Sequence, residues 1–226
     1  MLDALFWGLV GAGGLLVGAV GAMRMPVPAR YVGAAIIVTA GAVICSFGFD
    51  LDEKAYELGG GAAATLGVIG GALALYVASR MLDRPAPGGG VSALLLPALP
   101  ASVVIAITVV EDADVGGAIL LTVFLWNIAY GAWVVTGLHE AGRLSPEVLR
   151  PFGIAVIVSG LAAGVAYLAL ESAPDGVVAT AHAAGIGATL CAVVDAMVPI
   201  AFASQVRAVG ALALVGFGVG FGLSII

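Results

Sequence analysis

The sequence GGAILLTVFLWNIAYGAWVVTGL, residues 116–138, decides the fold class of this chain. It is longer than the roughly 20 apolar residues that a helix needs to cross the hydrocarbon core of a bilayer. Asn127 lies near its middle, where a carboxamide needs a hydrogen-bond partner or a ligand to offset the loss of water. The stretch therefore predicts a membrane-spanning helix with a polar group near the midplane.

The composition extends this prediction to the whole chain. Of its 226 residues, 62% are hydrophobic and 10% are charged, and the mean hydropathy is +1.18. A soluble core of this size does not require so much apolar sequence. We therefore expect an all-α polytopic membrane protein, with the lipid bilayer as its partner and eight spans at 5–23, 31–49, 60–82, 91–110, 116–138, 152–170, 177–203 and 208–226.

The arginines predict the orientation of these spans. They all lie in alternate connectors, after the first, third, fifth and seventh spans: Arg24, Arg30, Arg80, Arg84, Arg143, Arg150 and Arg207. Connectors rich in arginine stay in the cytoplasm. The pattern predicts a multi-pass protein of the cell membrane with both termini outside the cytoplasm.

Short connectors indicate one transmembrane domain, residues 1–226. The segment PAPGGG at 85–90 divides it into a first helical unit, 1–84, and five further helices, 91–226. Glycines are frequent in the first and last spans, and small residues let membrane helices approach closely. Such faces suit either a homodimer or packing within the bundle.

Acidic residues predominate in the other connectors, and the sequence pI is about 4.6. Asp50, Asp52 and Glu53 directly follow the second span. A cluster of like charge concentrates counter-ions, so these residues are candidates for the outer mouth of a cation pathway. General solvation of an acid-rich surface is the alternative.

The fourth span contains Pro97 and Pro100, which predict a broken or strongly kinked helix because proline removes a backbone hydrogen bond. Freed carbonyl groups at membrane depth occur where they are buried in protein or line a cavity. Ser102 directly follows these prolines in the sequence. The segment is either part of a binding site or a kink satisfied by neighbouring helices.

His182 and Asp195 are the ionisable groups deep in the seventh span. Their separation along a helix is about 20 Å, so they cannot share one ion. An intramembrane carboxylate is by default a functional hypothesis. Alternatively, Asp195 satisfies groups exposed by a kink at Pro199 or pairs with Arg207.

Four stretches together resemble the ZIP (Zrt/Irt-like) metal transporters, especially a prokaryotic branch: TAGAVICSFGFDLDEKAY (39–56), LPALPASVVIAITVVE (96–111), VFLWNIAYG (123–131) and AAGIGATLCAVVDAMVPIAF (183–202). The stretches occur in the family's order, and the resemblance as a whole covers nearly the whole chain. The resemblance implies eight spans in a 3+2+3 arrangement, both termini outside, and transport of zinc-like cations.

The family's metal-binding motifs are degenerate here. In the fourth helix, where the family carries motifs such as D-G-I-P-E-S, the acidic positions are Pro97 and Ala101. In the fifth helix, where the family carries motifs such as S-N-x-P-E-G, Ala129 replaces the proline and Tyr130 the glutamate. A divalent transition metal commonly takes about four ligands, usually with anionic charge. These replacements therefore predict that the site binds a divalent metal much more weakly than the family's usual site.

The resemblance and the residues together define the candidate site. The candidate metal ligands are Asn127, Ser102, Asp195 and His182, and the candidate pathway or cavity residues are Pro100, Tyr130 and Trp126. No cofactor is expected, except that a divalent metal can be the transported substrate.

Three hypotheses remain open. The first is a ZIP-like transporter of divalent metals with weakened or relocated ligands. The second is a transporter of the same fold for another solute, and the third is a ligand-depleted paralogue that acts as a non-transporting partner subunit. An enzyme is not expected, because the sequence has no catalytic triad, phosphate loop or HExxH motif. Nucleic-acid binding is not expected, because a basic patch is missing.

Overall fold

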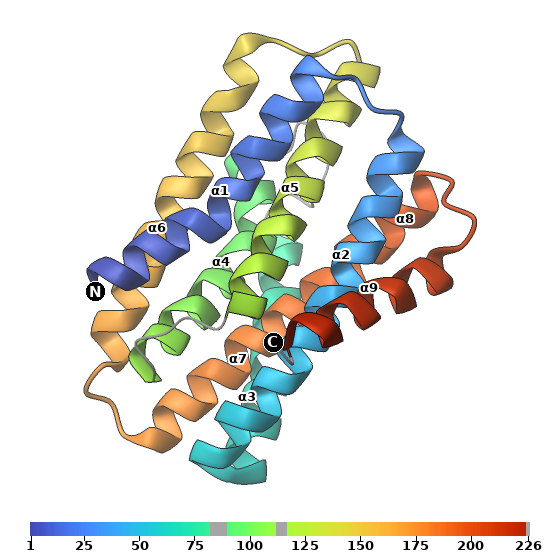
Figure 1. The fold of residues 1–226 in the computed structure, drawn as a ribbon. Helices are drawn as coiled ribbons and strands as arrows, with labels where there is room; N and C mark the ends of the chain where they lie inside the picture. Colours follow the sequence, from blue (N-terminus) through green and yellow to red (C-terminus); the bar gives the residue numbers. More distant parts are fainter. Residues whose placement is uncertain (82–89, 112–116, 225–226) are drawn as a thin grey trace.

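The computed structural model describes residues 1–81, 90–111 and 117–224. Every regular element in these ranges is helical (Figure 1): α1 (Leu2–Arg24), α2 (Ala29–Asp50), η1 (Leu51–Tyr56), α3 (Glu57–Met81), α4 (Gly90–Glu111), α5 (Gly117–Glu140), η2 (Pro146–Val148), α6 (Leu149–Leu170), α7 (Asp175–Ala192), η3 (Val193–Met197), α8 (Val198–Ala203) and α9 (Val209–Ser224). The elements η1 and η3 are π-helices, and η2 is a 3₁₀-helix.

Seven helices of the described part are long and apolar enough to cross a membrane, with residues 175–203 counted as one continuous span. They match the first seven predicted spans. The last predicted span forms α9, whose described part has 16 residues and is about 24 Å long. Large apolar side chains such as Leu73 and Leu214 are exposed, as expected for faces in contact with lipid. The all-α, multi-pass prediction is confirmed.

The helices form two groups according to their contacts. In the first helix group, α1 packs along α5 and α6, and α4 packs along α6. In the second helix group, α3 packs along α7, α2 packs along α9, and α2 also contacts α8. The two groups meet where α2 contacts α5 and where α4 contacts α7.

Glycines allow the tightest of these helix pairs. A side chain at Gly18 of α1 would overlap the backbone carbonyl of Ile128 in α5, and one at Gly71 of α3 would overlap that of Ala184 in α7. Only glycine lets two helix backbones approach so closely, which maximises van der Waals contact between membrane helices. The glycine-rich pattern therefore serves packing within the bundle at these positions.

Prolines lie inside two spans, of which α4 is a continuous α-helix from Gly90 to Glu111 and the seventh contains a π-helical turn. Pro97 and Pro100 lie inside α4. In the seventh span, Pro199 follows the π-helix η3, in which the Val198 N–H bonds to the Val193 carbonyl, five residues earlier. A π-helical turn is a common way to accommodate a missing backbone donor, and such turns are frequent at functional sites.

Candidate functional site

The side chain of Asn127 holds two helices of the first helix group together. It is 2% exposed, and its Nδ2 donates a hydrogen bond of 2.9 Å to the Gly11 carbonyl of α1. The same face of α1 lies against α5 at Gly14, where a Cβ would come within 3.0 Å of the Asn127 Cβ. The amide group therefore has an interhelical partner, which offsets the loss of water.

Tyr130 satisfies a backbone group that the first α4 proline exposes. Pro97 has no N–H for the Ala93 carbonyl four residues earlier. The Tyr130 hydroxyl, which is fully buried, donates a hydrogen bond of 3.0 Å to that carbonyl. The α4 backbone at Pro97 is thereby stabilised by α5, and the Tyr130 ring stacks on Trp133 with 5.7 Å between ring centroids.

Of the other predicted residues of this region, Ser102 and Trp126 are buried and Pro100 is half-buried. Ser102 donates a hydrogen bond of 2.9 Å to the Ala98 carbonyl of its own helix. Pro100 contacts α7, since its carbonyl oxygen lies 3.5 Å from the position of a Cβ on Gly185. Trp126 is 1% exposed and belongs to the main hydrophobic core. Within the described residues, its Nε1 has no hydrogen-bond partner.

Asn127, Tyr130 and Ser102 thus donate to three different backbone carbonyls. We call the region around these three residues the α4–α5 centre. Within residues 1–81, 90–111 and 117–224, no three His, Cys, Asp or Glu side chains lie close enough to hold one metal ion. In this structure the donor atoms of Asn127 and Tyr130 therefore join helices, and that of Ser102 bonds within α4.

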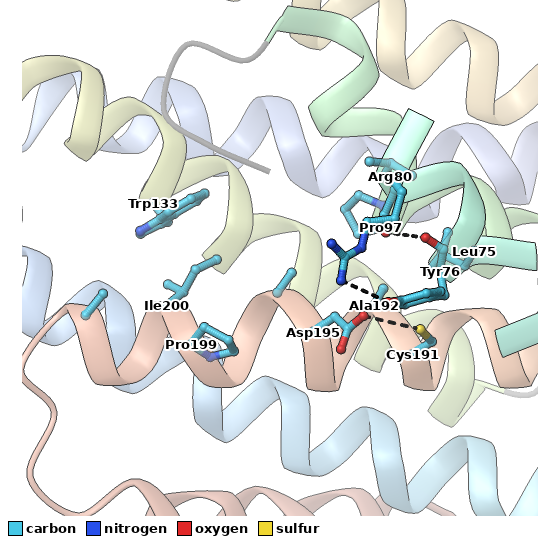
Figure 2. Close-up of a pocket in the computed structure, with 14 residues that line it drawn as sticks. Leu75, Tyr76, Arg80, Pro97, Trp133, Cys191, Ala192, Asp195, Pro199 and Ile200 are labelled. Carbon is cyan, nitrogen blue, oxygen red and sulfur yellow. Dashed lines mark hydrogen bonds between the residues drawn. The ribbon is translucent and has the colours of Figure 1, made fainter. Parts of the chain in front are cut away.

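A cleft of about 480 Å³ lies beside this centre, between the two helix groups. Residues from α3, α4, α5 and the α7–η3–α8 span line it (Figure 2): Leu75, Tyr76, Ser79, Arg80, Leu96, Pro97, Trp133, Cys191, Ala192, Asp195, Ala196, Pro199, Ile200 and Ala203. We call it the proline cleft, because Pro97 of α4 and Pro199 of α8 both line it. Its volume lies within the range of small-molecule sites in proteins.

Two charged side chains of opposite sign line the proline cleft. Arg80, one residue before the end of α3, donates from Nη2 to the Tyr76 hydroxyl at 2.9 Å, and its Cζ lies 4.9 Å from the centroid of that ring. Asp195 is exposed in the cleft and accepts a long contact of 3.8 Å from the Cys191 thiol. Figure 2 shows both contacts, each between residues one helical turn apart.

The remaining predicted site residues lie elsewhere. His182 is fully buried in α7 and does not line the proline cleft. Asp50 is the last residue of α2, and Asp52 and Glu53 belong to η1. The side chains of these three acids lie outside the described part of the structure.

The sequence pattern predicted Asp195 as a site residue but missed its neighbours. In the sequence, Arg80 contributes only to the predicted orientation of the spans. Neither Trp133 nor Cys191 is among the predicted site residues. A weak signal exists for two of them. Tyr76 precedes Arg80 by four residues, and Cys191 precedes Asp195 by four, which places each pair on one helix face. What joins them in one cleft is the packing of α3 along α7.

Comparisons with known proteins give no assignment for the chain. No family model matches it, and no curated protein sequence matches it.

Proposed function

We propose that this protein is a ZIP-like membrane transporter that moves a small solute through the proline cleft. The observation that carries the proposal is the cleft itself, which lies where two groups of packed helices meet and contains two unlike charges. Charged residues within membrane spans mark solute pathways. Discontinuous helices at the interface of two repeats are where many transporters bind their substrates.

The helix contacts support a 3+2+3 arrangement. Suppose that the first three spans correspond to the last three, with α1 matching α6, α2 matching α7 and α3 matching α9, and that α4 matches α5. When each helix is replaced by its match, the contact of α3 with α7 becomes the contact of α9 with α2. Likewise the contact of α1 with α5 becomes that of α6 with α4, and α2 with α5 becomes α7 with α4. All six contacts are extensive. Since each unit has three spans and two spans separate them, the second unit enters the membrane from the opposite side, as in inverted repeats.

The π-helices fit the same exchange. The element η1 directly follows α2, and η3 directly follows α7. Each repeat thus carries a π-helix at the corresponding place. Inverted repeats of this kind allow alternating access, in which one helix group rocks against the other and exposes the substrate first on one side and then on the other.

The arginine pattern supports a cytoplasmic opening of the proline cleft. Arg80 lies at the end of α3 and Ala203 at the end of α8, and both line the cleft. The connectors after these two helices carry arginine, which predicts that they lie in the cytoplasm. Both termini then lie outside, in a protein of the cell membrane.

Two substrate classes follow from two different observations. The three residues of the α4–α5 centre are amide and hydroxyl groups that donate to backbone carbonyls, with no anionic ligand among them, which favours a solute other than a divalent metal ion. The thiol of Cys191 beside the carboxylate of Asp195 favours a divalent metal, because thiolate and carboxylate are ligands of zinc-like ions. In the second case the metal ligands have moved from α4 and α5 to the seventh span.

Flux into liposomes that contain the purified protein tests the proposal. One set of measurements uses Zn²⁺, Mn²⁺ and Cd²⁺, and a second uses a pool of small organic solutes quantified by mass spectrometry. We expect at least one solute to enter faster than into protein-free liposomes. Asp195→Asn should slow that flux, whereas Asn127→Ala should leave the rate per folded molecule unchanged.

The pattern of results separates the alternatives. Metal flux that is lost in Cys191→Ser and in Asp195→Asn assigns the protein to the divalent-metal class. Organic-solute flux that survives Cys191→Ser assigns it to the other class. If wild type carries none of the solutes, the transport proposal is wrong, and the protein is then better explained as a non-transporting partner subunit.

A further inference from the structure

The charges of the proline cleft suggest the chemical class of its substrate. Arg80 and Asp195 come from α3 and from η3 of the seventh span, and both line the same cleft. Within the described residues, they form no ion pair with each other. The side chain of Arg80 contacts Tyr76, and that of Asp195 contacts Cys191. The cleft therefore presents one cation and one anion that do not neutralise each other directly.

Both groups retain most of their hydrogen-bonding capacity. A guanidinium group has five N–H donors, and one bond, to the Tyr76 hydroxyl, is formed by Arg80. A carboxylate has about four acceptor sites, and Asp195 receives one contact from a thiol, which is a weak donor. Hydrogen bonds to ligand groups of opposite charge would be stronger than either existing contact.

The same two charges disfavour the simpler ligand classes. A bare cation attracted by Asp195 would at the same time be repelled by Arg80, and a bare anion attracted by Arg80 would be repelled by Asp195. An uncharged solute would displace water from both groups without compensating either charge. A molecule that carries both a negative and a positive group satisfies Arg80 and Asp195 together.

The rest of the cleft suits an apolar body. Leu75, Leu96, Pro97 and Ile200 contribute apolar surface from three spans. The indole ring of Trp133 is held in place by its stacking on Tyr130. A volume of about 480 Å³ accommodates a molecule the size of an amino acid with an apolar side chain.

We infer that the proline cleft binds a zwitterion with an apolar body, with its anionic group at Arg80 and its ammonium group at Asp195. The inference rests on the proposed transport function and names the substrate class of the same cleft. Such chemistry is found in a free amino acid and in the headgroup of a zwitterionic lipid.

Equilibrium binding to the full-length protein in nanodiscs of anionic phosphatidylglycerol tests this inference. The probes are L-leucine, 4-methylpentanoate, which lacks the ammonium group, and 3-methylbutylamine, which lacks the carboxylate. We expect wild type to bind leucine at least about tenfold more tightly than either analogue, because each analogue leaves one charged group without its partner.

Two variants assign the charges. Arg80→Gln should remove the advantage of leucine over the amine, and Asp195→Asn should remove its advantage over the carboxylate. Arg143→Gln and Glu171→Gln, which change exposed charges outside the cleft, should bind all three probes as wild type does. A general structural defect would weaken all three probes alike and would not give this crossed pattern.

The outcomes are separable from those of the flux experiment. No leucine binding by wild type, equal binding of the three probes, or equal weakening of all three in both variants overturns the inference, even if flux of another solute is found. If phosphatidylethanolamine in the nanodisc competes with leucine, the natural ligand is a lipid headgroup; if it does not compete, the ligand is a free solute. Either result supports zwitterion binding.

Discussion

The α4–α5 centre and the proline cleft both place polar side chains in membrane-spanning helices, but they use them differently. In the centre, Asn127 and Tyr130 donate to backbone carbonyls of other helices. In the cleft, Arg80 and Asp195 contact only side chains one turn away on their own span. The first arrangement uses its polar groups to join helices, whereas the second keeps charged atoms available to a ligand.

The difference teaches that a polar residue at membrane depth need not mark a site. Pro97 leaves the Ala93 carbonyl without a backbone donor, and the Tyr130 hydroxyl donates to that carbonyl instead. Such a bond satisfies a carbonyl freed by proline without any ligand. The charged residues near Pro199 have no equivalent set of interhelical bonds in the described structure, which is why the proline cleft is the better candidate for transport.

The strongest test of this contrast is to join the two helix groups across the cleft. In a Cys45→Ala background, Leu96→Cys on α4 together with native Cys191 spans both groups. A short bifunctional maleimide that joins them should abolish flux, because rocking of the groups is blocked. Flux is measured in proteoliposomes before and after the reagent.

The matched control joins two residues of one group. Tyr76→Cys on α3 and native Cys191 lie in the same cleft but belong to helices that pack along each other. Joining them should leave more flux than the cross-group link does. Equal inhibition by both links would contradict the proposed rocking of the two groups.

The next largest effect is expected for the charge in the cleft. Asp195→Asn keeps the size of the side chain but removes the anion, so flux of the transported solute should fall at least about tenfold. The melting temperature in detergent should change little, because the carboxylate is exposed and contacts only a thiol. A large loss of thermal stability with normal flux per folded molecule would assign Asp195 a structural role.

The wall of the cleft depends on the contact of α3 with α7. Gly71→Ala would place a methyl group against the Ala184 carbonyl, and overpacking of this kind destabilises by roughly 1–3 kcal/mol. Gly70→Ala is the matched control, since no atom lies within 4 Å of its added Cβ. Unfolding by SDS compares the two variants. Equal stability would show that the close backbone contact is not essential.

A smaller effect is expected where a side chain satisfies the α4 carbonyl freed by Pro97. Tyr130→Phe leaves the Ala93 carbonyl without its donor and should lower the unfolding free energy by about 1 kcal/mol, as for other interhelical hydrogen bonds in membranes. Tyr167→Phe on α6 is the matched control. The flux rate per folded Tyr130→Phe molecule should stay close to wild type. A selective loss of flux would instead place Tyr130 in the solute pathway.

The smallest effect is expected for Ser102→Ala. The Ser102 hydroxyl bonds to the Ala98 carbonyl of its own helix, a pattern that contributes little to helix stability. The unfolding free energy should change by less than about 0.5 kcal/mol, with flux unaffected. A clear loss of metal flux in this variant would restore Ser102 as a ligand.

The fold class and most helix boundaries were predictable because they depend on local sequence. Hydrophobic runs set the spans, and the predicted span 116–138 corresponds to α5, Gly117–Glu140. Pro97 and Pro100 predicted a broken or strongly kinked helix, whereas α4 is one continuous α-helix from Gly90 to Glu111. The predicted span 208–226 corresponds to α9, which begins at Val209 and continues to Ser224, the last described residue.

The candidate site was only partly predictable. Asp195 stands out in sequence because a carboxylate in an apolar run is costly. The partner of Asn127, by contrast, lies 116 positions away in the chain, so no local pattern could show that this amide stabilises packing. Arg80 looked like a topology signal, because nothing in its neighbourhood indicates that α3 packs along α7.

The sequence by itself determined that the chain is a multi-pass bundle of apolar helices, because apolar length and proline positions act locally. The tertiary structure decided which polar groups satisfy backbone carbonyls and which share a cleft. Close packing at glycines such as Gly71 brings α3 against the seventh span and so places Arg80 and Asp195 in one cavity. That placement depends on distances between segments far apart in the chain, which periodicity and composition do not encode.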